Sequence, residues 1–162
     1  MLTALINIKH SEKKPTLILF TMFFTIVFAT ITGSAMRDTI FLIQFDKKFL
    51  PIMYLFIAIA MTFLVTIYNK YSSEKDQLSL LILLGLLFSL TLLIFQFYLS
   101  TWTIPIFYIW IEIITIFSIM QFWLVAGEIF NPRQAKRIFP LIIAGGSIAA
   151  IFSGYCIGSF VK

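Results

Sequence analysis

A single carboxylate interrupts one of the long apolar stretches of this chain. Glu112 lies within TIPIFYIWIEIITIFSIM, where every neighbour is uncharged. Placing an ionised side chain at the centre of a bilayer costs at least about 2.5 kcal/mol on insertion scales. We therefore expect Glu112 to face a protein interior or a water-filled cavity. It can serve there as part of a substrate or proton pathway, or as a structural residue that is ion-paired or protonated.

Two further charges, Arg37 and Asp38, follow the first apolar stretch. Arg37 and Glu112 both fall in the outer half of the expected membrane region, so an ion pair between them is one hypothesis. By helix rise their depths differ by roughly 10 Å, so direct contact needs a tilted helix and the long reach of arginine. The alternative is that Arg37 only marks the membrane interface.

The helical wheel divides the polar residues around Glu112 between two faces. At about 100° per residue, Trp123 falls near the face of Glu112, whereas Gln121 and Glu128 share the opposite face. Two polar faces on one segment are typical of a helix inside a bundle. They also argue against an intramembrane enzyme that would use Glu112 together with Glu128.

The residue inventory excludes most other chemistry. The chain has one cysteine, Cys156, and one histidine, His10, so neither an internal disulfide nor a cysteine or histidine metal cluster can form. No Ser/His/Asp arrangement is present, so we expect no enzyme and no cofactor. The net charge is +5, but no basic helix face or RNA-binding aromatic motif accompanies it, which excludes nucleic acid as the expected partner.

The elements that must position these residues are membrane-spanning helices. The chain of 162 residues is 60% hydrophobic and only 12% charged, and its mean hydropathy is +1.01, which excludes a water-soluble domain. About 20 apolar residues cross the hydrocarbon core. We predict one all-α, polytopic transmembrane domain over residues 1–162, with spans at about 16–45, 49–69, 78–99, 103–127 and 139–161, and a short surface helix at about 132–138.

The distribution of basic residues predicts a cytoplasmic N-terminus, because cytoplasmic loops are rich in Lys and Arg. With this orientation eight basic residues lie inside (Lys9, Lys13, Lys14, Lys70, Lys75, Arg133, Lys136, Arg137) and four outside (Arg37, Lys47, Lys48, Lys162). The inner-mouth residues Arg133, Lys136 and Arg137 either anchor this topology or attract anionic substrates.

Local signals mark the starts of two helices and the packing face of the last one. Ser73-x-x-Asp76 can cap the third span, and Asn131-Pro132-Arg133-Gln134 reads as an N-cap, a first helical proline and a glutamine that reaches back to the cap amide. Small residues then recur every four positions, which lets a neighbouring backbone approach closely. This ladder, Gly146, Ala150, Gly154 and Gly158, is either a static packing face or a sliding interface.

The stretch from Gln121 to Gly146 resembles the ATP:ADP antiporter family, the nucleotide transporters of obligate intracellular bacteria and plastids, which are akin to the major facilitator superfamily. The shared text is Phe122-Trp123, then Ala135-Lys136-Arg137 with the aromatic Phe139, and then a small-residue-rich helix; Arg37-Asp38 matches an Arg/Lys-Asp pair of the family. The sequence LVAGE after Trp123 departs from the amide-rich run of nucleotide carriers.

The resemblance implies two six-helix halves that work by alternating access in a bacterial inner membrane, with a small anion such as ATP or ADP as substrate. The chain would then supply most of the N-terminal half. Five helices are fewer than one half, so we expect a fragment, or a protein that needs a missing half, a second copy or a partner membrane protein. The rival is an accessory subunit that does not transport and packs through its small residues. The substrate pathway implied is Arg37, Asp38, Glu112, Gln121 and Trp123.

Overall fold

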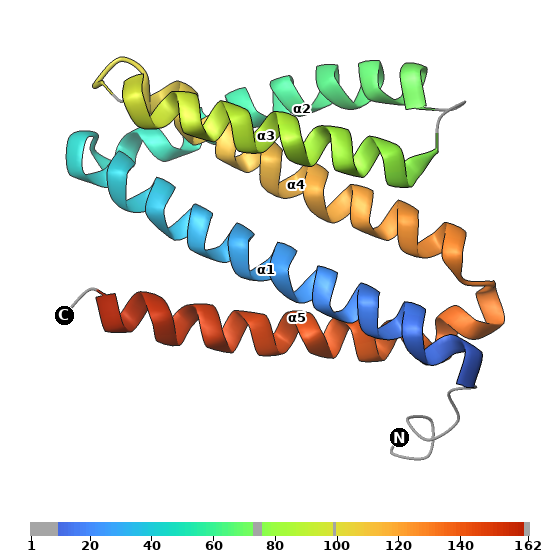
Figure 1. Ribbon diagram of the computed structural model, residues 1–162. Helices are drawn as coiled ribbons and strands as arrows, with labels where there is room; N and C mark the ends of the chain where they lie inside the picture. The colour runs from blue at the N-terminus through green and yellow to red at the C-terminus, as the bar shows by residue number, and fades with distance from the viewer. Residues whose placement is uncertain (1–9, 73–75, 99, 161–162) are drawn as a thin grey trace. The chain divides into compact units, whose positions relative to one another are not determined.

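The computed structural model describes residues 10–72, 76–98 and 100–160, and these ranges are almost entirely helical (Figure 1). The order is α1 (His10–Gln44), a short 3₁₀ turn η2 (Lys47–Phe49), α2 (Leu50–Ser72), α3 (Gln77–Tyr98), α4 (Ile104–Ile129) and α5 (Pro132–Phe160). Within the described ranges, five helices are long and apolar enough to cross a membrane. The predicted all-α class with five spans is confirmed.

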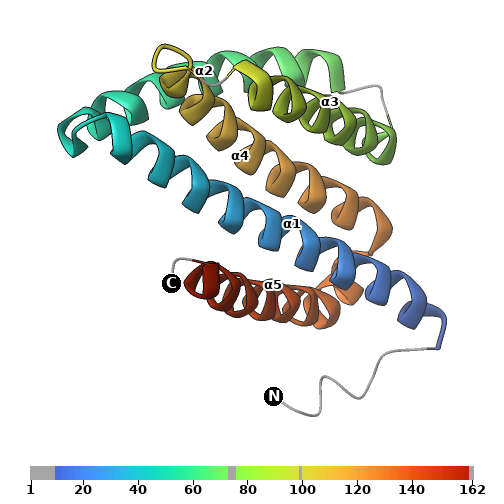
Figure 2. The ribbon, with the colours of Figure 1, turned by 60° about the vertical axis from the view of Figure 1, so that its left-hand side comes forward.

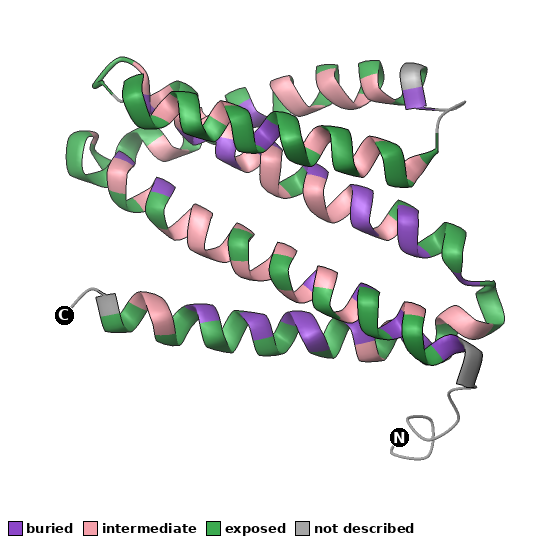
Figure 3. Cartoon of the chain, viewed as in Figure 1, coloured by how far each residue is buried: buried purple, intermediate pink, exposed green. Residues whose placement is uncertain are grey.

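Large apolar side chains on α2 and α3 remain exposed. Phe63, Leu86 and Phe97 are 68%, 67% and 80% accessible, and exposed residues cover most of α3 (Figure 3). Contiguous apolar surface of this extent is unfavourable in water, whereas lipid tails solvate it. Helices are the form such segments take, because each backbone amide finds its acceptor within the same segment.

The helices pack as two compact units, which we describe separately. Unit 1 holds residues 1–32 and 122–162, so α5 packs along the first part of α1 (Figure 2). Its core contains Phe23, Phe122 and Ile142. Unit 2 holds residues 33–121, with α2 and α3. The divisions fall inside α1 and α4 and not in a loop. A single transmembrane domain over residues 1–162 stays a prediction.

The start of α5 follows the predicted capping pattern. The backbone amide of Asn131 donates to the Gln134 side-chain oxygen at 3.1 Å. The backbone amides of Gln134 and Ala135 donate to the backbone carbonyl of Asn131. Pro132 is the first helical residue, as predicted. The expected separate surface helix at about 132–138 does not occur, because these residues are the first turns of a helix that continues unbroken to Phe160.

Asp76, the second residue of the predicted Ser73-x-x-Asp76 capping pattern, is the N-cap of α3. Asp76 accepts hydrogen bonds from the Ser79 amide at 3.0 Å and the Ser79 hydroxyl at 2.8 Å, and the helix begins at Gln77. Ser73 lies outside the described residues. These hydrogen bonds from Ser79 hold the pKa of the Asp76 carboxyl below its ordinary value.

This cap predicts acid-sensitive order at the start of α3. The folded-state pKa of Asp76 is lowered, so its contribution is present above the unfolded-state pKa and is lost as the pH falls through the folded-state pKa, below about pH 4. The protection of the Ser79 amide against hydrogen exchange is therefore expected to fall when the solution is acidified. Asp76→Asn keeps an oxygen acceptor and should remove this pH dependence, whereas an unchanged profile in Asp76→Asn would contradict the assignment.

Candidate functional site

Arg37, Asp38 and Glu112 form an ion-pair cluster in unit 2. The Arg37 side chain is only 5% exposed, and its Nη1 donates a hydrogen bond to Oε2 of Glu112 within an ion pair. The other guanidinium atoms meet Asp38, with Nη2 at 2.9 Å and Nε at 3.0 Å from Oδ1. The predicted contact between Arg37 and Glu112 is confirmed.

Two aromatic side chains, one turn away on each helix, position this cluster. Phe41 follows Arg37 by four residues on α1, and Tyr108 precedes Glu112 by four residues on α4, so each lies on the same helix face as its charged neighbour. The rings of Phe41 and Tyr108 pack with centroids 4.8 Å apart. The Arg37 guanidinium carbon lies 4.3 Å from the centroid of Tyr108, within cation–π range.

The charges of the cluster are unequal in number and in exposure. One sealed cation faces two carboxylates, and the side chains of Glu112 and Asp38 are 23% and 47% exposed. A buried ion pair is sensitive to the loss of either partner, because the remaining charge is left without compensation. The cluster can exchange a carboxylate partner of Arg37 for an incoming anion. It has no group arranged for covalent catalysis.

Gln121 belongs to a separate hydrogen-bonded chain in unit 2. Its side-chain amide donates to the Tyr68 hydroxyl on α2, and that hydroxyl donates to the Gln77 side-chain oxygen on α3 at 3.1 Å. Gln121 is 1% exposed, and its own side-chain oxygen has no hydrogen-bond partner among the described residues. The chain ties α2, α3 and α4 together. A pathway role for Gln121 remains a prediction.

Trp123 belongs to unit 1 and not to the ion-pair cluster. Its ring packs edge-on against Phe23, Phe122 and Phe139, with centroids 5.3, 5.3 and 5.1 Å apart. The helical wheel gave its angular position on α4 but not the helix that faces it. Glu128, which shares a wheel face with buried Gln121, is exposed near the end of α4.

The small-residue ladder of α5 is divided between two faces, and only Gly146 of its members packs tightly against α1. A Cβ atom built on Gly146 would lie 2.6 Å from Cε1 of Phe23. The residues that accompany Gly146 on the buried face are Gly145, Ala149 and Ser153, and the Ser153 hydroxyl lies 3.0 Å from that of Thr32 on α1. The remaining ladder members, Ala150, Gly154 and Gly158, are exposed.

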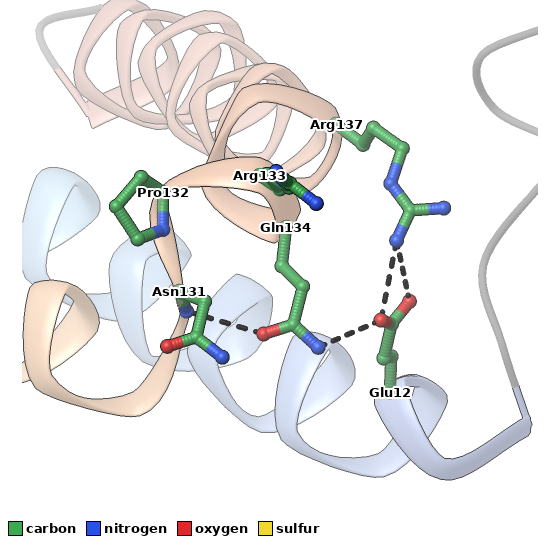
Figure 4. A pocket seen from close by; sticks show the side chains of 6 residues that line it. All are labelled: Glu12, Asn131, Pro132, Arg133, Gln134 and Arg137. Carbon is green, nitrogen blue, oxygen red and sulfur yellow. Dashed lines mark hydrogen bonds and ion pairs between the residues drawn. The ribbon is translucent and has the colours of Figure 1, made fainter.

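The start of α5 meets Glu12, a residue that the sequence analysis did not select. Glu12 is 5% exposed and lies in the first turn of α1. Arg137 Nη2 lies 3.2 and 3.3 Å from the two carboxylate oxygens of Glu12. The side-chain amide of Gln134 donates to one of these oxygens at 2.9 Å (Figure 4). The sequence does not single out Glu12, because the lysines beside it indicate only the membrane orientation. Arg133 and Lys136 are exposed.

Among the described residues, no group of three His, Cys, Asp or Glu side chains lies close enough together to hold a metal ion. The candidate sites are therefore the Arg37 cluster in unit 2 and the basic residues at the start of α5 in unit 1.

A known family model matches the second part of the chain. Residues 91–162 match the model of the TLC ATP/ADP transporter family. No curated protein and no solved structure matches the chain. The matched segment contains α4 and α5, including Glu112, Gln121, Trp123 and the basic residues at the start of α5. The similarity to the ATP:ADP antiporter family is thereby confirmed for this segment, and it identifies a transporter family and not an enzyme family.

Proposed function

We propose that this chain forms part of a membrane transporter that exchanges nucleotides or other organic anions by alternating access. The observation that carries the proposal is the match of residues 91–162 to an ATP/ADP transporter family, on a chain with five helices able to span a membrane. Arg37 adds chemical support, since its guanidinium is a cation inside a membrane-spanning segment and matches the geometry of phosphate oxygens.

In the proposed mechanism, Arg37 is the anion-binding cation and Glu112 its resting partner. A substrate phosphate displaces Glu112 from the guanidinium, and water that enters with the substrate then solvates the released carboxylate. Asp38 keeps Arg37 oriented during the exchange. Bidentate guanidinium–phosphate bonds provide both the energy and the geometry of binding.

The proposed setting is a bacterial inner membrane with the N-terminus in the cytoplasm, supported by the excess of basic residues on that side. A missing transporter half, a second copy or a partner membrane protein completes the path. Exposed Ala150, Gly154 and Gly158 on α5 favour the second candidate function, an accessory subunit that binds a partner without transporting.

The test is nucleotide exchange by the chain in its own membranes. We expect radiolabelled ATP loaded into vesicles to leave when unlabelled ADP, but not adenosine, is added outside. The intact mass of the native protein is measured in the same preparation, and it separates a short chain that assembles from part of a longer carrier. If vesicles that contain the protein and every co-purifying partner show no counterflow with any organic anion, the accessory-subunit function replaces transport.

A further inference from the structure

The start of α5 and the first turn of α1 line an open, charged pocket within unit 1. It has a volume of about 670 Å³ and is lined by Glu12, Asn131, Pro132, Arg133, Gln134 and Arg137. The ion-pair cluster of Arg37 contributes nothing to this lining. The pocket is therefore distinct from the site used in the proposed transport function.

The donors of this pocket suit an oxyanion. Arg133 and Arg137 are four residues apart, so they lie on one face of α5, with Gln134 beside them. Guanidinium groups match the geometry of phosphate oxygens in a way that a lysine ammonium does not. The pocket also opens at the beginning of a helix, where the backbone dipole places partial positive charge. Among the described residues of the lining, two arginines and one glutamate leave an excess of positive charge.

The pocket already holds an anion of its own, the carboxylate of Glu12. Arg137 reaches both of its oxygens and Gln134 reaches one, so two different side chains of α5 converge on a single oxyanion (Figure 4). A phosphate group that enters would compete for these donors, and Arg133 adds a cation that the structure places in the lining. The arrangement is that of an anion site regulated by an internal competitor.

We infer that this pocket binds a phosphate-bearing anion by displacing Glu12 from Arg137. The same phosphate chemistry is offered by a nucleotide in solution and by the head group of an anionic lipid. The inference does not depend on transport, because it concerns equilibrium binding at residues outside the Arg37 cluster.

The experiment measures the binding of two phosphate-bearing probes, one soluble and one lipid, to the full chain. Pyrophosphate is titrated by calorimetry into protein in phosphatidylcholine nanodiscs, and retention of phosphatidylglycerol is measured by native mass spectrometry in a separate arm. Arg133→Ala is expected to weaken binding about tenfold, since it removes a charge-assisted contact. Lys136→Ala is the matched control, because Lys136 is an exposed cation of the same helix turn that does not line the pocket.

Glu12→Gln gives a result of opposite sign. It removes the competing charge, so pyrophosphate or lipid binding should tighten, an outcome that a merely misfolded variant cannot produce. Response in the pyrophosphate arm assigns the site to soluble phosphates, and response in the lipid arm assigns it to a head group; either supports the inference. It is overturned if neither probe binds, if Lys136→Ala weakens binding as much as Arg133→Ala, or if Glu12→Gln weakens it.

Discussion

Glu112→Gln is expected to lower the unfolding free energy of the detergent-solubilised protein by about 3 kcal/mol. It should also slow anion exchange strongly, because no Glu112 carboxylate then returns to Arg37 to release the substrate phosphate. The substitution leaves Arg37 sealed from solvent with Asp38 as its only carboxylate in this cluster. Removing one partner of a buried ion pair costs about 3–5 kcal/mol, and Asp38 retains part of the compensation, which places the value at the lower end. Reversible unfolding in mixed micelles measures the first effect, and ATP/ADP counterflow the second.

Glu128→Gln is the matched control for this prediction. It removes the same charge from the same helix, but Glu128 is exposed, so the stability should change by less than about 0.5 kcal/mol. The charge swap of Arg37→Glu with Glu112→Arg should recover part of the stability of each single variant. Recovery stays incomplete because the new glutamate stands beside Asp38. Equal losses for Glu112→Gln and Glu128→Gln would contradict a specific pair.

The contact between Arg37 and Glu112 was accessible from sequence because the cost of burying charge in a membrane leaves few arrangements. A lone acidic residue in an apolar helix needs a partner, and Arg37 is the cation in the same half of the expected membrane region that a tilted helix brings within reach. The aromatic side chains that position this ion pair, Phe41 and Tyr108, could not be predicted from the sequence by the same argument. Phe41 and Tyr108 look like any other apolar-facing aromatic residues until the two helices are seen to meet.

Other features depended on which helices are neighbours, and a single sequence does not contain this information. The helical wheel predicts that Trp123 lies near the face of Glu112, whereas its surroundings are the aromatic side chains of unit 1. The division into two units falls within α1 and α4, where no glycine or proline cluster marks a boundary. Glu12 stands beside lysines that the cytoplasmic orientation of the N-terminus already explains, so the sequence gives no separate reason to select Glu12.

The ladder of α5 illustrates the same limit on a smaller scale. A four-residue spacing identifies a face that drifts slowly around the helix, because four residues turn it by 400°. Gly146 and Gly158 therefore point in different directions, and the packed face continues through Ala149 and Ser153. The periodicity indicated close packing, while the neighbouring helix determined which members take part.

Alanine at Gly146 and alanine at Gly154 are expected to change stability in opposite directions. The new Cβ at position 146 would lie 2.6 Å from Phe23, whose ring is held by Phe122 at 4.7 Å and Trp123 at 5.3 Å between centroids. Overpacking of this kind costs about 1–3 kcal/mol. Nothing lies within 4 Å of a Cβ at Gly154, so Gly154→Ala should stabilise α5 by up to about 1 kcal/mol through helix propensity alone.

The two variants are compared by reversible unfolding and by the fluorescence of Trp123 in chains whose other tryptophans are replaced by phenylalanine. Gly146→Ala should shift the Trp123 emission, because its ring contacts Phe23 directly. Gly154→Ala should leave the emission unchanged, and Gly154→Leu should do the same while it blocks any close approach of a partner helix. Loss of a co-purifying protein in Gly154→Leu, with normal stability, would then assign the exposed small residues to an interface. If Gly146→Ala is as stable as Gly154→Ala, the close contact between α5 and α1 is wrong.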